Sequence, residues 1–415
     1  MAGGDHRIEV NGRAYRRPIR PTVVVCVDGF DPAYLEHGLR TRTLPVLAEF
    51  HRTGFAARAR AAVPTTTNPN NTSIVTGAPP SVHGVNGNFY LDRETGAEVM
   101  VTDAHLLRCA TVLAAMSRAG VATAAITAKD KLRKLLGHGM RGACFSSERA
   151  AHCTRAEHGI DDVERLVGRA APDPYSVDLS LFVLDAGLRL LDRDRPALMY
   201  LSLSDLVQHA FPPGAPESDA FHRAVDDRLG RLRALGATVA VVADHGMNDK
   251  ATPAGDPNVV YVEDELTARF GPGAARVICP IADPFVRHHG ALGSFVRVYA
   301  RRTRDLGALA GAIRGLPGVT DVLDADQVCG AYELPRDREA DLAVFADRCT
   351  ALGARREDHD TSGLVGRRLR SHGGLAEREV PLVLSHPLTD EYAARAGAAP
   401  LRNFDVLDLA LNGVR

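Results

Sequence analysis

Four stretches of the chain are continuous runs of apolar residues, many of them β-branched or small. They span residues 22–27, 122–127, 197–203 and 237–243. A run without polar alternation is typical of a strand buried on both faces, as in a parallel sheet. The segments between these runs have helical spacing of apolar positions, and we expect helices at 44–52, 105–118, 180–194 and 218–235. Strands that alternate with helices predict an α/β fold, with a mostly parallel sheet flanked by helices.

The hydrophobic pattern changes between residues 250 and 368. Short alternating segments at 259–262, 295–299 and 341–345, with a helical segment at 306–314, are typical of a small α+β unit with an antiparallel sheet. A buried run returns at 380–384, and a last helix is expected near 404–411. We therefore predict a core formed by residues 1–249 and 369–415, with a smaller α+β domain inserted at 250–368.

Three of the four predicted buried strands end in residues that bind metals or anions. Asp28 follows the first strand, Asp205 follows the third, and Asp244 and His245 follow the fourth. In an open α/β sheet, ligands bind beyond the carboxyl ends of the strands. One such aspartate is commonly a helix cap, but three aspartates and a histidine at one edge indicate a ligand set.

Two further histidines complete this candidate set. His209 lies four residues after Asp205, so one helical turn places both side chains on the same face. His372 precedes Gly373 and Gly374, which allow the backbone to fold tightly around it. Three carboxylates and three imidazoles suit Zn²⁺, and they are too many for one tetrahedral ion but sufficient for two. Iron and manganese remain alternatives at oxygen-rich sites.

Residues 63–71 (VPTTTNPNN) place three hydroxyls beside an Asn-Pro step. Asn68 is a favourable N-cap and Pro69 a favourable first helical residue, so we expect a helix from here to about Gly77. Thr67 then lies in the turn just before the helix. A hydroxyl there is close to free backbone N–H groups and to the positive end of the helix dipole, which suits a phosphate. On local grounds alone, this stretch is a capped helix start.

Composition excludes several classes of function. The net charge of −1 provides no basic face for a nucleic acid or a membrane surface. The sequence shows no transmembrane run and no signal-peptide pattern. The seven cysteines are odd in number and have no CxxC spacing, so we expect reduced thiols in a cytoplasmic protein. Lysine is scarce, and this makes Lys129 and Lys131, at the end of the second predicted strand, candidates for binding an anion. The alternative is a solvated basic strand end.

Together these motifs resemble the alkaline phosphatase superfamily, in its nucleotide pyrophosphatase/phosphodiesterase branch. The resemblance covers nearly the whole chain through five motifs in order, at residues 27–29, 64–71, 205–209, 244–247 and 372–374. It implies two zinc ions, one held by Asp28, Asp244, His245 and the Thr67 hydroxyl, and the other by Asp205, His209 and His372. It also implies that Thr67 is the nucleophile and that Asn88 donates to a phosphoryl oxygen. The inserted unit corresponds in position to the cap domain of the family.

Lys129 and Lys131 match the lysines with which one subfamily holds a substrate carboxylate. The resemblance therefore implies a hydrolase that cleaves the carbon–phosphorus bond of a small phosphonate carrying a carboxylate, through a phospho-threonine intermediate. Three alternatives stay open: a phosphatase or phosphodiesterase acting on another small organophosphate, an isomerase like the cofactor-independent phosphoglycerate mutases, and a non-catalytic metal-binding protein. The sequence also leaves open the role of His288 and His289 and whether the chain forms a homodimer.

Overall fold

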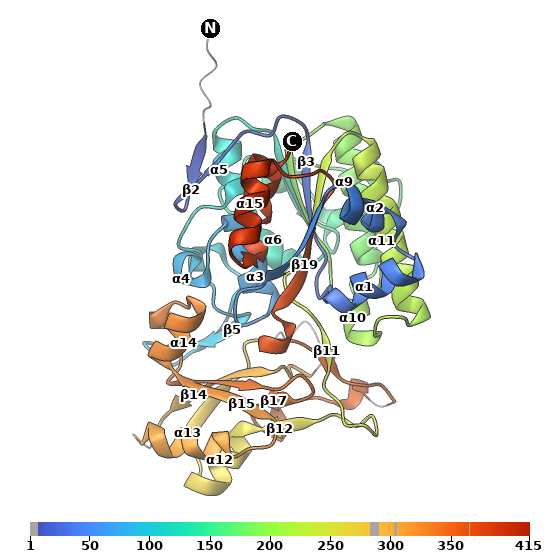
Figure 1. Cartoon of the computed structure of the whole chain (residues 1–415). Coiled ribbons are helices and arrows are strands. Elements are labelled where there is room, and N and C mark those ends of the chain that lie inside the picture. The colour runs from blue at the N-terminus through green and yellow to red at the C-terminus, as the bar shows by residue number, and fades with distance from the viewer. Residues whose placement is uncertain (1–6, 283–289, 303–304, 365) are drawn as a thin grey trace.

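The computed structural model describes residues 7–282, 290–302, 305–364 and 366–415. His288 and His289 therefore lie outside the described residues. The described chain forms a large α/β part built on one sheet and a smaller part below it in Figure 1. Among the described residues, no helix combines the length and apolarity that a bilayer crossing requires. All seven cysteines are free thiols.

The larger part is built around an eight-stranded mixed sheet. Its central strands are fully buried, as their uninterrupted apolar sequences predict, and they run parallel to one another. Only β19 runs antiparallel to its two neighbours. In spatial order the strands are β20 (Leu401–Arg402), β4 (Phe55–Arg60), β19 (Glu379–Leu384), β10 (Thr238–Val242), β3 (Thr22–Cys26), β9 (Leu198–Ser202), β7 (Thr123–Thr127) and β8 (Gly142–Ser146).

The register of the central strands brings their carboxyl ends to one level. Cys26, the last residue of β3, lies beside Ser202 of β9 and Val242 of β10. The segments that follow these three strands therefore start next to one another. This alignment places the predicted polar strand ends at a common edge of the sheet.

Helices cover both faces of the sheet (Figure 1). On one side lie helices that carry a buried apolar stripe and a charged outer face. These are α2 (Pro45–Thr53), α9 (Asp178–Arg193) and α11 (Pro216–Ala234). The other side carries α3 (Thr67–Thr76), α5 (Val112–Arg118), α15 (Asp390–Ala398) and α16 (Val406–Asp408). At the carboxyl edge lie three short helices and one longer one: α4 (Pro80–His83), α6 (Asp130–Leu136), α10 (Leu206–Ala210) and α1 (Pro32–Thr41).

The smaller part has its own antiparallel sheet and its own hydrophobic cluster. The sheet order is β13 (Ala275–Ile278), β14 (Phe295–Ala300), β16 (Leu342–Ala346) and β15 (Val319–Asp324). Helices α12 (Val262–Phe270), α13 (Leu306–Arg314) and α14 (Ala325–Tyr332) pack against it. The chain enters and leaves this part through two adjacent strands, because β11 (Asn248–Asp249) pairs with β18 (Arg370–Ser371). The division into residues 1–249 with 369–415 and 250–368 stays a prediction.

Two strands were missed by the sequence prediction, and one predicted helix begins later than expected. Strand β4 (FAARAR) lacks a continuous apolar run, and pairing with β19 and β20 makes it a strand. Strand β8 was also missed, because its sequence shows little periodicity; it forms by parallel pairing with β7. The helix expected at 105–118 begins only at Val112. The Thr111 hydroxyl accepts the N–H of Ala114 and caps it there, and residues 104–106 form a separate 3₁₀ turn.

Candidate active site

Thr67 is the first residue of helix α3, in the position that follows the cap. The N-cap position is Thr66, whose backbone is extended at φ −127° and ψ 159°. The prediction that Asn68 caps the helix was therefore wrong by two residues. The Asn68 N–H is instead satisfied from a distant loop, because it donates to Oδ1 of Asn88 over 3.1 Å. Because the side chain that accepts this N–H lies 20 positions further along the chain, the local sequence gives no sign of it.

Helix α3 is polar in sequence yet buried from Asn68 to Thr76, so its side chains need partners inside the protein. Asn71 donates to Oδ2 of Asp244 at 3.0 Å, and its own Oδ1 accepts the hydroxyls of Tyr200 and Ser202 at 2.7 and 2.9 Å. Asn70 bonds the backbone of the loop before the helix, including the carbonyls of Pro64 and Thr66. Sequence reasoning missed these supporting roles. The available signal was the pair of adjacent asparagines, which are poor helix formers.

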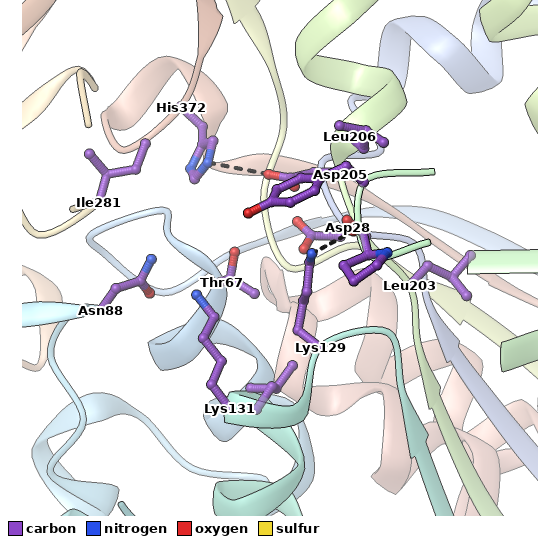
Figure 2. Close-up of a pocket in the computed structure, with 14 residues that line it drawn as sticks. Asp28, Thr67, Asn88, Lys129, Lys131, Leu203, Asp205, Leu206, Ile281 and His372 are labelled. Carbon is purple, nitrogen blue, oxygen red and sulfur yellow. Dashed lines mark hydrogen bonds and ion pairs between the residues drawn. The ribbon is translucent and has the colours of Figure 1, made fainter. Parts of the chain in front are cut away.

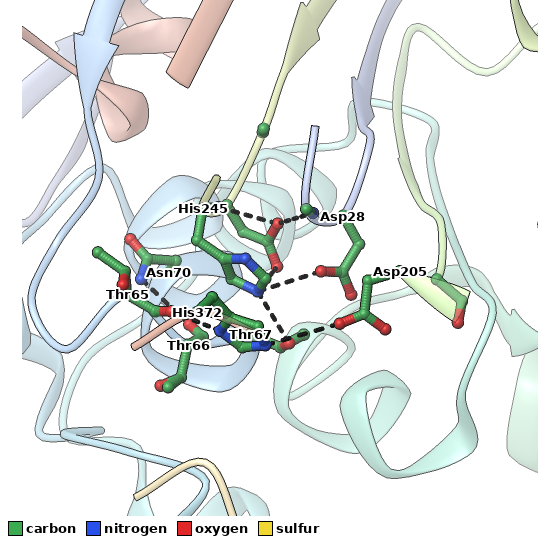
Figure 3. A network of polar contacts seen from close by, with 12 residues as sticks. Asp28, Thr65, Thr66, Thr67, Asn70, Asp205, His245 and His372 are labelled. Carbon is green, nitrogen blue, oxygen red and sulfur yellow. Dashed lines mark hydrogen bonds and ion pairs between the residues drawn. The ribbon is translucent and has the colours of Figure 1, made fainter. Parts of the chain in front are cut away.

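The ends of β3 and β10 meet above the first turn of α3 (Figure 3). Nε2 of His245 lies 3.2 Å from Oδ1 of Asp28 and 3.7 Å from Oδ2 of Asp244. The Thr67 hydroxyl is 3.5 Å from the same nitrogen. Four of the predicted site residues are thus brought together, although they are up to 217 positions apart in sequence.

The remaining three predicted ligands form an adjoining group. Oδ2 of Asp205, which follows β9, lies 2.9 Å from Nε2 of His209 and 3.7 Å from Nε2 of His372. The groups are continuous, because the imidazoles of His245 and His372 stack with ring centroids 3.6 Å apart and planes at 11°. Figure 3 shows the ion pair between His372 and Asp205 close to Thr67.

All three histidines present Nε2 to the carboxylates, because Nδ1 is engaged on the other side of each ring. A carbonyl oxygen accepts only, so each Nδ1 must carry a proton, and a ring that is neutral then has its lone pair on Nε2. This tautomer is the one in which a histidine binds a metal through Nε2 while a backbone acceptor orients it. The carbonyls belong to Gly246 at 2.9 Å from His245, Arg370 at 2.7 Å from His209, and Thr65 at 2.7 Å from His372.

The negative charge of the clustered carboxylates favours binding of a cation. Burial, together with the charges of Asp205 and Asp244, raises the pKa of Asp28 well above its ordinary value. Donor atoms of Asp28, Asp244 and His245 all lie within 4.8 Å of one another, and so do those of Asp205, His245 and His372. His245 belongs to both groups, whereas His209 joins through Asp205. Although burial opposes it, the same carboxylates raise the pKa of His245 to about 10, so this site favours positive charge. Converging carboxylates and imidazoles fit divalent metal ions, which would neutralise the negative charge in place of protons.

The loop that carries His372 is hydrogen-bonded to the loop before helix α3, which contains Thr65. The Thr65 hydroxyl accepts the N–H of Gly373 at 3.0 Å and donates to the carbonyl of Gly374 at 2.9 Å. Gly373 has φ +118°, a conformation that side chains other than glycine rarely adopt. These contacts hold His372 against the turn that presents Thr67.

A cavity of about 50 Å³ opens beside Thr67. Its walls include the two lysines, Asn88 and the apolar side chains of Leu206 and Ile281 (Figure 2). Because Oδ1 of Asn88 accepts the Asn68 N–H, its amide nitrogen remains the donor at the cavity wall. Figure 2 shows the Lys131 side chain extending towards Thr67.

The two lysines are held differently. Lys129, in the cap position of α6, donates to the carbonyl of Pro174 at 2.8 Å. Lys131 lies within the first turn of the same helix, and burial lowers its pKa to about 8. His83 lies outside this cavity; its ring bonds the hydroxyl of Ser73 at 2.8 Å, and burial lowers its pKa to about 3.

Residues 22–373 match the family described as type I phosphodiesterase/nucleotide pyrophosphatase. The chain belongs to this family. Among solved structures, it is similar to phosphonoacetate hydrolase from Sinorhizobium meliloti 1021, in complexes with phosphonoformate and with phosphonoacetate. Each is 43% identical, with 98% of both chains covered and a TM-score of 0.93. It also resembles murine ectonucleotide pyrophosphatase/phosphodiesterase 5 at 16% identity, with 94% of both chains covered and a TM-score of 0.60, which is a likeness of fold alone. The alkaline-phosphatase-like α/β fold of this family is thereby confirmed.

Proposed function

We propose that this protein is a phosphonoacetate hydrolase, which cleaves the carbon–phosphorus bond to give acetate and phosphate. The observation that carries the proposal is the shared cavity of Thr67, Lys129 and Lys131 beside the carboxylate–histidine cluster. A nucleophile and anion-binding groups face one small space, with cationic side chains where a substrate carboxylate would lie. The similarity to structures of phosphonoacetate hydrolase supports the same substrate.

The difficulty of the reaction lies in its leaving group. Cleavage of the carbon–phosphorus bond leaves the electron pair on the methylene carbon, and the adjacent carboxylate can delocalise it as an enolate. In our proposal the Thr67 oxygen attacks phosphorus in line, and Lys129 and Lys131 neutralise the charge that develops on the departing carboxylate. The Thr67 hydroxyl loses its proton as its oxygen bonds to phosphorus, and the methylene carbon takes up a proton as it leaves, giving acetate. Water hydrolyses phospho-Thr67 and releases phosphate.

The metal ligands in this proposal are those that the resemblance implies. Asp28, Asp244, His245 and Thr67 would hold one Zn²⁺, and Asp205, His209 and His372 would hold the other. Bound zinc would supply Lewis-acid stabilisation of phosphoryl charge and would lower the pKa of a coordinated hydroxyl. Among the residues of the chain, the amide nitrogen of Asn88 would donate to a phosphoryl oxygen.

One assay separates the proposal from its alternatives. Phosphate release is measured from phosphonoacetate, from p-nitrophenyl phosphate and from a nitrophenyl diester. A phosphonoacetate hydrolase gives its highest kcat/KM with the first substrate. A higher value with the diester or with the monoester would identify a phosphodiesterase or a phosphatase of the same family instead. No turnover of any of them by metal-loaded protein would leave the isomerase and the non-catalytic role as the remaining alternatives.

Metal removal should inactivate the enzyme without unfolding it. Dialysis against a chelator is expected to lower activity by more than about 10²-fold, because three clustered carboxylates then repel one another and Thr67 loses its activating cation. Added Zn²⁺ should restore activity, and metal analysis should return two ions per chain. Full activity in metal-free protein would contradict the di-zinc assignment.

The pH dependence should differ between substrates. The Lys131 ammonium is charged below its pKa of about 8 and becomes neutral above it. We therefore expect kcat/KM for phosphonoacetate to fall as the pH rises through about 8, because the carboxylate loses a cationic partner. An aryl phosphate has no carboxylate and should not show this fall. Lys131→Arg, which stays charged, should remove it. Identical profiles for both substrates would contradict a carboxylate role for Lys131.

The cellular context is part of the same proposal. Seven free thiols without a disulfide suit a reducing compartment, so we place the enzyme in the cytoplasm. Residues 250–368 would act as a cap, since Ile281 from this segment lines the cavity. The partner in this proposal is a small phosphonate.

A further inference from the structure

We propose that the Pro174–Tyr175 turn positions Lys129 and limits the length of the substrate at its carboxylate end. This inference rests on the proposed function and extends it to a residue pair outside the family motifs quoted above. Both residues line the same cavity as Thr67 and the two lysines.

Two contacts from this turn hold the Lys129 ammonium. Nζ donates to the carbonyl oxygen of Pro174 at 2.8 Å and lies 5.2 Å from the centroid of the Tyr175 ring. A lysine head group on a four-carbon stem has many rotamers, so one hydrogen bond would not fix its direction. The carbonyl and the aromatic face together restrict it to the rim of the cavity. An ammonium has three donors, and the carbonyl of Pro174 occupies one of them.

Hydrogen bonds within residues 173–176 restrict the conformation of this turn. The carboxylate of Asp173 accepts the N–H of Tyr175 at 2.8 Å, and the carbonyl of Asp173 accepts the hydroxyl of Ser176 at 2.8 Å. Helix α9 begins directly afterwards, at Asp178. The Tyr175 side chain is nevertheless 61% exposed. A large aromatic side chain that is exposed at a cavity rim contributes little to the hydrophobic core, and here the ring contacts Lys129 and lines the cavity.

The position of the ring has a consequence for specificity. A phosphonate is anchored at one end by Thr67 and the metal ligands and at the other by the lysines. Lys129, fixed against Tyr175, sets the distance between these anchors. The Tyr175 side chain also stands where a longer carbon chain would extend. A phosphonate with one carbon between phosphorus and carboxylate should therefore fit better than one with two.

Four variants test these two roles separately. Tyr175→Phe keeps the ring, Tyr175→Leu keeps much of the volume but removes the π face, and Tyr175→Ala removes both. Val177→Ala is the matched control, because Val177 is also exposed in this segment but does not line the cavity. Phosphonoformate, phosphonoacetate and 3-phosphonopropionate are measured as competitive inhibitors of p-nitrophenyl phosphate hydrolysis, together with kcat and KM for phosphonoacetate.

The expected result is graded. Val177→Ala should behave like the wild type, and Tyr175→Phe, which keeps the aromatic ring, should weaken phosphonoacetate binding less than Tyr175→Leu does. Tyr175→Leu should weaken phosphonoacetate binding about fivefold, the effect of one cation–π contact. Tyr175→Ala should do the same and should also improve inhibition by 3-phosphonopropionate relative to phosphonoformate. In a Lys129→Met background, Tyr175→Leu should not weaken phosphonoacetate binding further, because Tyr175 acts on the substrate carboxylate by positioning Lys129.

The inference fails if Tyr175→Leu weakens phosphonoacetate binding equally in the wild-type and in the Lys129→Met background. It also fails if Tyr175→Ala does not improve inhibition by 3-phosphonopropionate relative to phosphonoformate. Failure of the proposed function looks different, since the wild type would then not hydrolyse phosphonoacetate at all. Even in that case, the dependence of the inhibition constants on Tyr175 still decides whether the turn positions Lys129.

Discussion

Replacing Thr67 with alanine should lower phosphate release from phosphonoacetate by about 10⁴-fold or more, because the attacking oxygen is lost. The zinc content should remain close to that of the wild type, since the two metal groups keep their carboxylates and imidazoles. The fold should change little. Thr67 is half-buried, and its hydroxyl contact in the structure is a long one, 3.5 Å from Nε2 of His245. Unfolding and metal analysis should therefore be measured beside activity.

Thr67→Ser provides the matched control for this experiment. Serine keeps the nucleophilic oxygen but loses the methyl group that restricts the side-chain rotamer, so part of the activity should remain. Quenching a reaction of the wild type should also trap phosphate on Thr67, whereas Thr67→Ala should trap none. Substantial turnover by Thr67→Ala would show that water attacks phosphorus directly, and it would overturn the phospho-threonine mechanism while leaving the metal site unaffected.

The second large effect concerns the choice of substrate. Lys129→Met and Lys131→Met should each lower kcat/KM for phosphonoacetate by about 10- to 100-fold, because a hydrogen bond to a charged group contributes about 1.5–3 kcal/mol. Hydrolysis of p-nitrophenyl phosphate should change less than about threefold, since that substrate has no carboxylate. Methionine keeps the length of the stem, so the comparison isolates the charge. The measurement is the ratio of kcat/KM for the two substrates.

Lys134→Met is the matched control for these two variants. Lys134 belongs to the same short helix, α6, but it is exposed and does not line the cavity. It should leave both substrates unaffected. Equal losses on both substrates in Lys129→Met and Lys131→Met would mean that the lysines contact the phosphoryl group or hold α6 in place. The substrate assignment would then lose its main support, while the hydrolytic mechanism would stand.

The identity of the central strands and of the residues that follow them could be predicted from sequence. A strand buried on both faces must be apolar throughout, so β3, β7, β9 and β10 are visible as uninterrupted runs. The topology of a parallel sheet then places their carboxyl ends together, and this predicted that Asp28, Asp205 and Asp244 would lie at one edge. The structure brings them together with His209, His245 and His372. Their catalytic roles stay predictions.

What the sequence by itself determined is thus the set of polar residues and the edge of the sheet at which they gather. The tertiary structure alone decided how each is oriented. The carbonyls of Gly246, Arg370 and Thr65 select the tautomers of the histidines, and a backbone carbonyl carries no sequence signal. The Asn88 side chain accepts the N–H of Asn68 at the start of α3. Pro174 and Tyr175 contact the Lys129 ammonium. Each of these contacts joins segments that are distant in the chain. Periodicity reports which face of a segment is buried, whereas the partner that a buried polar group finds depends on the packing of the whole fold.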